Sequence, residues 1–192
     1  MLSPGTAAPA FKLADADMAL VESSEFRGKR NFVLYFYDRD NLPGSTVEAL
    51  EFSDLADQFA RCNCEILGVS PDDWMSHAEF RDKHGITVRL LADPDCDACN
   101  SYDVVKHPLP ASGGNGGNGR TSGDGGNGVS GSSGNAVVHG AAQAIVVCKR
   151  PHVLRSTFIV DRAGKVRHAL YGVTTPKGHA KEVLKLVKST LH

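Results

Sequence analysis

Residues 32–52, FVLYFYDRDNLPGSTVEALEF, decide the fold of this chain. Their first part, residues 32–37, is an apolar run rich in aromatic side chains, which predicts a buried strand. A polar loop with a Pro-Gly pair follows the strand, and a helix is predicted to begin at Ser45 or Thr46. The segment therefore predicts a strand, a loop and a helix in close succession.

The rest of the chain alternates predicted strands and helices, which favours a mostly parallel sheet covered on both faces. The helix after the loop is expected to pack on the sheet through residues at helical spacing, namely Phe52, Leu55 and Phe59. For the last helix, we expect Thr175 as the N-cap and Pro176 in the first turn. The expected inner face of that helix consists of Val183, Leu184, Leu186 and Val187.

The strand–loop–helix unit resembles the active site of peroxiredoxins of the bacterioferritin comigratory protein, or peroxiredoxin Q, subfamily. The family loop usually reads YPKDNTPGCT, and residues 37–46 here read YDRDNLPGST. Five further segments resemble the family in the same order, namely residues 4–29, 64–86, 90–105, 155–173 and 176–188. The resemblance implies a thioredoxin-like α/β fold, an αβα sandwich that opens with an N-terminal β-hairpin.

The same resemblance implies which residues would carry catalysis. The family's catalytic loop needs Pro, Thr and Cys at the spacing P-x-x-x-T-x-x-C, together with an Arg from a distant strand. Those positions here hold Asp38, Leu42, Ser45 and Arg155, so only the Arg is retained. Glu48, which supports the loop in the family, is also retained. In this chain Arg155 is expected to pair with Glu48 or with Asp38.

A serine at position 45 cannot perform the family reaction. Peroxide reduction requires a thiolate that attacks the O–O bond and becomes a sulfenic acid, whereas a serine hydroxyl stays protonated. We therefore expect Ser45 to act as a helix N-cap. Asp38 is expected to bring a carboxylate near the missing thiolate. The usual positions of the resolving cysteine hold Leu50 and Arg81.

These substitutions predict a degenerate peroxiredoxin without the family's activity, which is thioredoxin-dependent reduction of hydroperoxides. One alternative is a non-enzymatic binding or regulatory module on the same fold. Another moves dithiol redox chemistry to Cys96 and Cys99, which form a C-x-x-C motif at the expected start of a short helix. Acidic neighbours oppose thiol reactivity there, so two ordinary, semi-exposed thiols are also consistent with the sequence.

The other cysteines and histidines give weaker signals. Cys62 and Cys64 form a C-x-C that, in an extended segment, would point to opposite faces. With Cys96 and Cys99 they would make four sulfur ligands, formally enough for zinc, but the spacings are those of no known zinc module. His77 and His84 lie two helical turns apart and are expected on a solvated face. We predict no metal and no cofactor.

One segment departs from the family pattern. Residues 111–135 hold 11 of the protein's 20 glycines and almost no apolar side chains, so we expect them to be disordered. We interpret the chain as one domain, residues 1–192, with a low-complexity insertion at about residues 110–136. The apolar stretch 136–148 is compatible with a strand or with a short helix.

Composition excludes several classes of partner. The chain has 21 basic and 22 acidic residues and no basic block, which argues against nucleic-acid and membrane partners. Its start lacks the pattern of a signal peptide, and its five cysteines are an odd number. We therefore expect a cytoplasmic protein that is a monomer or homodimer. A hydroperoxide and thioredoxin are its partners by family resemblance.

Overall fold

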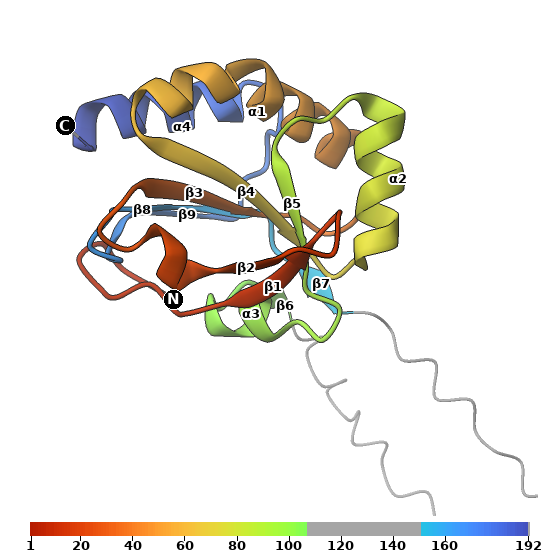
Figure 1. The fold of residues 1–192 in the computed structure, drawn as a ribbon, viewed down its shortest axis with the longest axis horizontal. Helices are drawn as coiled ribbons and strands as arrows, with labels where there is room; N and C mark the ends of the chain where they lie inside the picture. The colour runs from red at the N-terminus through yellow and green to blue at the C-terminus, as the bar shows by residue number, and fades with distance from the viewer. Residues whose placement is uncertain (107–150, 192) are drawn as a thin grey trace, which may run out of the picture. The chain divides into compact units, whose positions relative to one another are not determined.

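The computed structural model of this protein describes residues 1–106 and 151–191 (Figure 1). The chain divides into two compact units, of which the first comprises Met1–His107 and Pro151–His192. The fold described below is that of the first unit. The predicted insertion and the apolar stretch after it both lie outside the described residues.

A seven-stranded sheet forms the centre of the fold. Its strands follow one another in the order β2 (Leu20–Glu22), β1 (Lys12–Asp15), β5 (Arg89–Ala92), β4 (Cys64–Ser70), β3 (Asn31–Phe36), β8 (Ser156–Val160) and β9 (Val166–Tyr171). The pairs β3–β4 and β4–β5 are parallel, and the other four pairs are antiparallel. The prediction of a mostly parallel sheet is therefore wrong, because two hairpins, β1–β2 and β8–β9, extend a short parallel centre on both sides.

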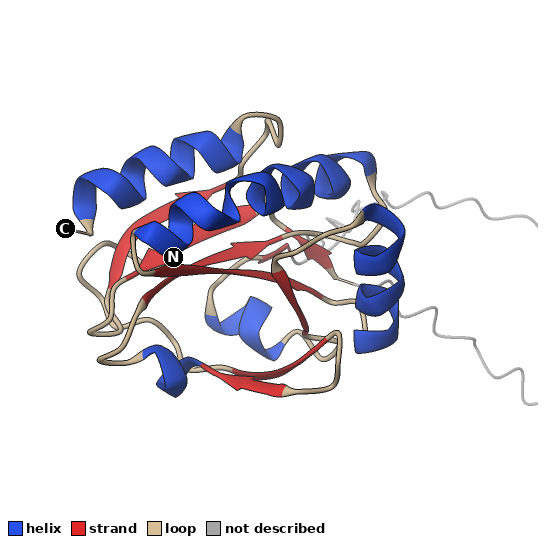
Figure 2. Ribbon diagram, turned by 45° about the horizontal axis from the view of Figure 1, so that its top comes forward, coloured by secondary structure: helices blue, strands red, loops and turns tan. Residues whose placement is uncertain are grey.

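Helices cover both faces of the sheet (Figures 1 and 2). One face carries α1 (Pro43–Arg61), α2 (Trp74–His84) and α4 (His179–Thr190), and the other carries α3 (Asp97–Ser101) and the short 3₁₀ helix η1 (Ser23–Phe26). This arrangement confirms the predicted thioredoxin-like sandwich with an N-terminal β-hairpin. No helix among the described residues is long and apolar enough to span a membrane.

Strand β3 explains why the sequence reads as a continuous apolar run. Successive side chains of a strand point to opposite faces of the sheet. Phe32, Leu34 and Phe36 accordingly join the core on the α3 face, while Val33 and Tyr35 join the core on the α1 face. All six residues of the strand are buried, and the five that follow Asn31 are apolar or aromatic.

The helices on the α1 face bury the residues that helical spacing predicts. In α1, Phe52 and Phe59 are fully buried and Leu55 is partly buried against the same core. In α4, the predicted inner face is confirmed as well: three of its four residues are buried and the fourth packs against them, the set being Val183, Leu184, Val187 and Leu186.

The start of α4 differs from the prediction. The helix begins at His179 and its N-cap is Gly178, so Thr175 and Pro176 precede it. Gly178 adopts φ 85°, and its N–H donates to the carboxylate of Glu51 on α1, at 2.7 and 2.9 Å from the two oxygens. A positive φ favours glycine, and the partner on α1 is distant in sequence, so local capping rules misplace this helix end.

The residues that flank the undescribed segment pair with each other. β6 (Val105–Lys106) and β7 (His152–Val153) form a two-stranded antiparallel sheet, in which Val105 lies opposite Val153 and Lys106 opposite His152. The amide of Leu154 also donates to the carbonyl of Val104 at 2.7 Å. The chain therefore leaves this domain and returns to it at neighbouring positions.

We predict that residues 111–135 can be deleted with little loss of stability. Their composition offers no core contacts, and the chain ends on either side are already joined by β6 and β7. Shortening such a segment lowers the entropic cost of loop closure by only about 1 kcal/mol. The measurement is thermal unfolding of the deletion variant beside the full chain. A melting temperature about ten degrees lower would show that the segment packs on the domain.

Candidate active site

Ser45 lies one turn inside a helix that begins earlier than expected. Helix α1 begins at Pro43, with Leu42 as its N-cap, which makes Ser45 the third helical residue. Proline suits the first position because its missing N–H would have no partner there. Ser45 is 1% exposed, and its hydroxyl has no hydrogen-bond partner within residues 1–106 and 151–191. The expected N-cap role of Ser45 is therefore wrong.

Arg155 pairs with Glu48 rather than with Asp38. The guanidinium of Arg155, which precedes β8, forms a hydrogen-bonded ion pair with the fully buried carboxylate of Glu48 on α1. A Cβ added to Gly44 would lie 3.2 Å from Nη2 of Arg155, so the guanidinium also lies against the backbone next to Ser45. The structure thus gathers the predicted residues Ser45, Glu48 and Arg155 at the N-terminus of α1.

Glu48 is placed where ionisation is costly. Burial raises the pKa of its carboxyl group to about 7, although the charge and hydrogen bond of Arg155 act in the opposite direction. One carboxylate oxygen, Oε1, has no hydrogen-bond partner among the described residues. Burial shifts the pKa of a carboxyl group upward because the charged form loses its hydration.

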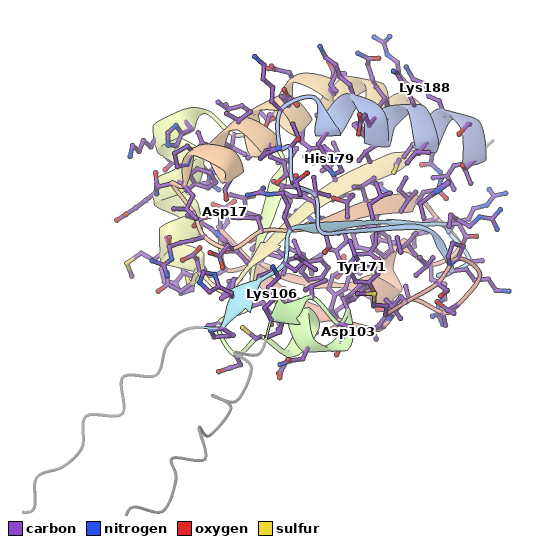
Figure 3. All side chains as sticks on the ribbon, turned by 180° about the vertical axis from the view of Figure 1, so that it is seen from behind. Asp17, Asp103, Lys106, Tyr171, His179 and Lys188 are labelled. Carbon is purple, nitrogen blue, oxygen red and sulfur yellow. The ribbon has the colours of Figure 1, made fainter. Side chains whose placement is uncertain are left out.

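His179 is a member of this site that the sequence did not single out. Its Nε2 atom lies 2.9 Å from the Thr157 hydroxyl on β8 and 4.0 Å from Oε1 of Glu48. Figure 3 shows His179 at the start of α4, on the side of the helix toward the sheet. Burial lowers the pKa of its imidazole. The only sequence signal for it was its place in a segment that resembles the family.

Asp38 connects the site loop to β7. Its Oδ1 atom accepts the backbone N–H of Val153 at 3.0 Å, and its Oδ2 atom lies 3.2 Å from Nδ1 of His152. Both oxygens of this carboxylate are therefore engaged two to three residues before Arg155. Proline, the family residue at this position, could make neither contact. Leu42, at the family's Thr position, is 39% exposed and offers no hydroxyl.

A buried polar network holds the loop against α2. Oδ2 of Asp40 lies 2.8 Å from Nδ1 of His77 and accepts the Ser76 hydroxyl at 2.9 Å, while Oδ1 accepts the Tyr37 hydroxyl at 2.7 Å. The amide of Asp40 donates to Oδ2 of Asp72 at 2.7 Å. Four long-range or buried contacts thus converge on Asp40, which sequence reasoning had not selected.

The prediction that His77 lies on a solvated face is wrong. Its side chain is fully buried beside Asp40, and its Nε2 atom has no hydrogen-bond partner among the described residues. His84 is half-buried, and its Nε2 atom lies 3.2 Å from Oδ1 of Asn41. Although they lie two helical turns apart on α2, the two histidines have different environments, because His77 packs beside Asp40 and His84 lies beside Asn41 of the loop.

The two cysteine pairs lie on opposite faces of the sheet. Cys96 and Cys99 are buried in the core on the α3 face, so the expectation of semi-exposed thiols is wrong. Cys62 and Cys64 contact the core on the α1 face together, because the intervening Asn63 adopts φ 50° and the segment is not extended. A four-sulfur zinc site is thereby ruled out. Among the described residues, no cluster of three or more His, Cys, Asp or Glu could hold a metal ion.

The positions usual for a resolving cysteine serve the fold here. Leu50 packs at the edge of the core on the α1 face. Arg81 forms ion pairs with Asp17, at 2.8 Å, and with Asp82, at 2.9 Å. Neither residue offers a thiol that could resolve an oxidised partner at position 45.

We predict that Glu48 makes stability fall as pH rises. Its folded-state pKa is raised, so its stabilising contribution is complete below the unfolded value and is lost as pH rises through about 7. Relative to Glu48→Gln, the wild type should lose about 2–3 kcal/mol of unfolding free energy between about pH 5 and pH 8. Urea denaturation at several pH values measures this difference.

The exposed Glu79 on α2 provides the matched control, because Glu79→Gln also removes one carboxylate from a helix. Its difference from the wild type should not change with pH in the same way. If the difference for Glu48→Gln is also constant with pH, Glu48 stays ionised throughout, and the Arg155 charge outweighs the burial of the carboxyl group.

Comparison with known proteins agrees with this fold. The sequence profile of the AhpC/TSA family matches residues 4–169. A putative peroxiredoxin of Mycobacterium tuberculosis is 33% identical over 182 residues, which cover 95% of this chain and 92% of the relative. Peroxiredoxin Bcp of Bacillus subtilis is 38% identical over 102 residues, 53% of this chain and 64% of that protein.

Solved structures give the same result. A mutant of the PrxQ of Xylella fastidiosa superposes with a TM-score of 0.73 at 27% identity, covering 98% of this chain and 97% of the other. The peroxidoxin BcpB of Mycobacterium tuberculosis superposes with a TM-score of 0.74 at 22% identity, covering 98% of each chain. From the matched residues and the relatives together, we conclude that this chain belongs to the AhpC/TSA family, among relatives of the peroxiredoxin Bcp and Q type.

Proposed function

We propose that this chain is a peroxiredoxin-fold protein that no longer reduces hydroperoxides by the family's mechanism. The observation that carries the proposal is the buried Ser45 hydroxyl at the N-terminus of α1, beside the backbone that Arg155 contacts. The family activity is thioredoxin-dependent reduction of hydroperoxides for redox homeostasis. Its nucleophile would have to be the side chain at this position.

The surroundings of Ser45 would suit a thiol but cannot activate a hydroxyl for this reaction. A helix N-terminus and a nearby cation lower the pKa of a cysteine enough to supply a thiolate at neutral pH. The hydroxyl of serine remains protonated, and an alkoxide has no counterpart of the sulfenic acid that stores the two electrons. The substitution therefore removes the chemical step itself.

The residues that remain support a non-enzymatic role. Arg155 is paired with Glu48, and Asp38 is bonded to β7. The side chains of Arg155 and Asp38, which lie at the family's catalytic positions, thus make contacts within the fold. We therefore propose a binding or regulatory module, in which hydroperoxide and thioredoxin are partners only through family descent.

We further propose that the protein acts in the cytoplasm as a monomer or homodimer. The four described cysteines, Cys62, Cys64, Cys96 and Cys99, are all free thiols, which is typical of proteins in a reducing compartment.

We predict no thioredoxin-coupled peroxide turnover above background for the purified protein. Ser45 provides no thiolate, and Asp38 and Leu42 provide neither the proline nor the hydroxyl of the family's loop. The measurement is NADPH oxidation coupled through thioredoxin reductase and thioredoxin, with peroxiredoxin Bcp of Bacillus subtilis as the positive control. Turnover at about a hundredth of the control rate would already contradict the proposal.

We predict that restoring the nucleophile alone gives only a slow reaction with peroxide. In Ser45→Cys, the helix N-terminus and Arg155 should lower the thiol pKa by about one unit. Leu42 still lacks the hydroxyl that would hydrogen-bond the peroxide. The triple variant Asp38→Pro, Leu42→Thr, Ser45→Cys should therefore react much faster than the single variant. Stopped-flow oxidation of the new thiol, with mass spectrometry of the sulfenic acid, measures both rates.

Asp38→Asn combined with Ser45→Cys is the matched control for the charge at position 38. It removes the negative charge but retains an oxygen that can accept the Val153 amide. A rise in rate in this control assigns the effect of position 38 to charge rather than to the contact with β7. A triple variant no faster than a free cysteine would show that the loop lacks peroxidase geometry.

A further inference from the structure

Helix α3 begins in an unusual way. Its N-cap is Cys96, which adopts φ 58° and makes no capping hydrogen bond with its side chain. The carboxylate of Asp93 does this instead, accepting the amide of Ala98 at 3.2 Å and the amide of Cys99 at 2.8 Å. Because Asp93 caps the helix, the side chain of Cys96 is available for another contact.

That contact is with Cys99. The N-cap residue and the third helical residue face each other across the first turn, which is the geometry that a capping box exploits. Cys96 and Cys99 occupy these two positions, and each side chain influences the pKa of the other thiol. The amide of Asn100 donates to the carbonyl of Cys96 at 2.8 Å and closes the turn between them.

The pair is enclosed on the α3 face of the sheet. Cys96 is 4% exposed and Cys99 is fully buried, in the same core as Phe36 and Tyr102. Of the two sulfur atoms, that of Cys96 is therefore nearer to solvent. The two cysteines lie in the first turn of α3 and in the same core, so a bond between their sulfur atoms would join two residues of one turn.

We propose that Cys96 and Cys99 form an intramolecular disulfide when the protein is exposed to a hydroperoxide. With hydrogen peroxide, the sulfur of Cys96 attacks one oxygen, the O–O bond breaks, and water leaves as Cys96 becomes a sulfenic acid. The sulfur of Cys99 then displaces the sulfenic oxygen, which leaves as a second water. The two thiols lose two electrons and two protons, and one peroxide is reduced to two waters.

The environment makes this a slow, long-lived modification rather than a catalytic turnover. Burial, followed by the Asp93 carboxylate, raises the pKa of both thiols. A scarce thiolate attacks slowly, and a thiol with a raised pKa is a poor leaving group when the disulfide is reduced. Burial also keeps external thiols from reaching the sulfur atoms. The proposal does not depend on the residue at position 45.

The test uses the full chain, treated with hydrogen peroxide and then with an alkylating agent, followed by peptide mass spectrometry. We expect the peptide that holds Cys96 and Cys99 to lose two hydrogen atoms and to escape alkylation. Reduction of this disulfide by glutathione should be at least about tenfold slower in the native protein than in urea, where the sulfurs are exposed.

Three variants separate the proposal from other outcomes. Cys62→Ser should leave the disulfide unchanged, whereas Cys99→Ala should abolish it and leave Cys96 as a sulfenic or sulfinic acid. Asp93→Asn, checked for folding by circular dichroism, should oxidise faster, by about threefold for each unit by which the thiol pKa falls, because a larger thiolate fraction is partly offset by lower nucleophilicity.

Several results would overturn the proposal. One is that Cys96 and Cys99 both remain alkylatable after Cys62 is fully oxidised. Another is that Cys96 becomes joined to Cys148 or to a second chain instead of to Cys99. Equal rates of reduction in native and urea-treated protein would also overturn it, because they would mean that the fold does not protect the bond.

Discussion

The buried ion pair between Glu48 and Arg155 is the constraint on which the rest of the site depends. It joins the second turn of α1 to the residue that precedes β8, and thus connects a helix to the sheet on which it packs. Removing one member of a buried pair costs about 3–5 kcal/mol, because the other charge is left unpaired. Both partners are therefore held by the fold, whatever residue lies at position 45.

This pair also determines which anion the Arg155 guanidinium contacts when position 45 holds no thiolate. Where the family has a cysteine at this position, the arginine stabilises a second anion, the thiolate at the helix N-terminus. Here the carboxylate of Glu48 is the one acidic group that the structure pairs with the Arg155 guanidinium in the described chain. The pKa of Glu48 consequently depends on burial and on Arg155 together, and Nε2 of His179 lies 4.0 Å from its Oε1 atom.

Much of the fold was predictable from sequence because it rests on periodicity. The apolar run of β3 and the helical spacing in α1 and α4 involve residues near each other in the chain, and the buried strand and the two inner helix faces predicted from them were confirmed. Three features that the sequence did not reveal share one cause. The start of α4, the burial of His77 and the partners of Asp38 depend on contacts between residues 37 to 127 positions apart, which no local pattern reveals.

The loop keeps its place for reasons that do not involve a nucleophile. Asp40 forms hydrogen bonds with Tyr37, Ser76, His77 and Asp72, which are buried or partly buried. Each buried polar group that lost its partner there would cost about 1–3 kcal/mol of folding free energy. Asp38 adds a hydrogen bond to β7, because its Oδ1 atom accepts the amide of Val153. None of these contacts involves Ser45, so they do not depend on which side chain occupies that position. The fold and the peroxidase reaction therefore have separate physical requirements. Many contacts throughout the chain hold the fold, whereas the reaction depends on a few side chains around the N-terminus of α1.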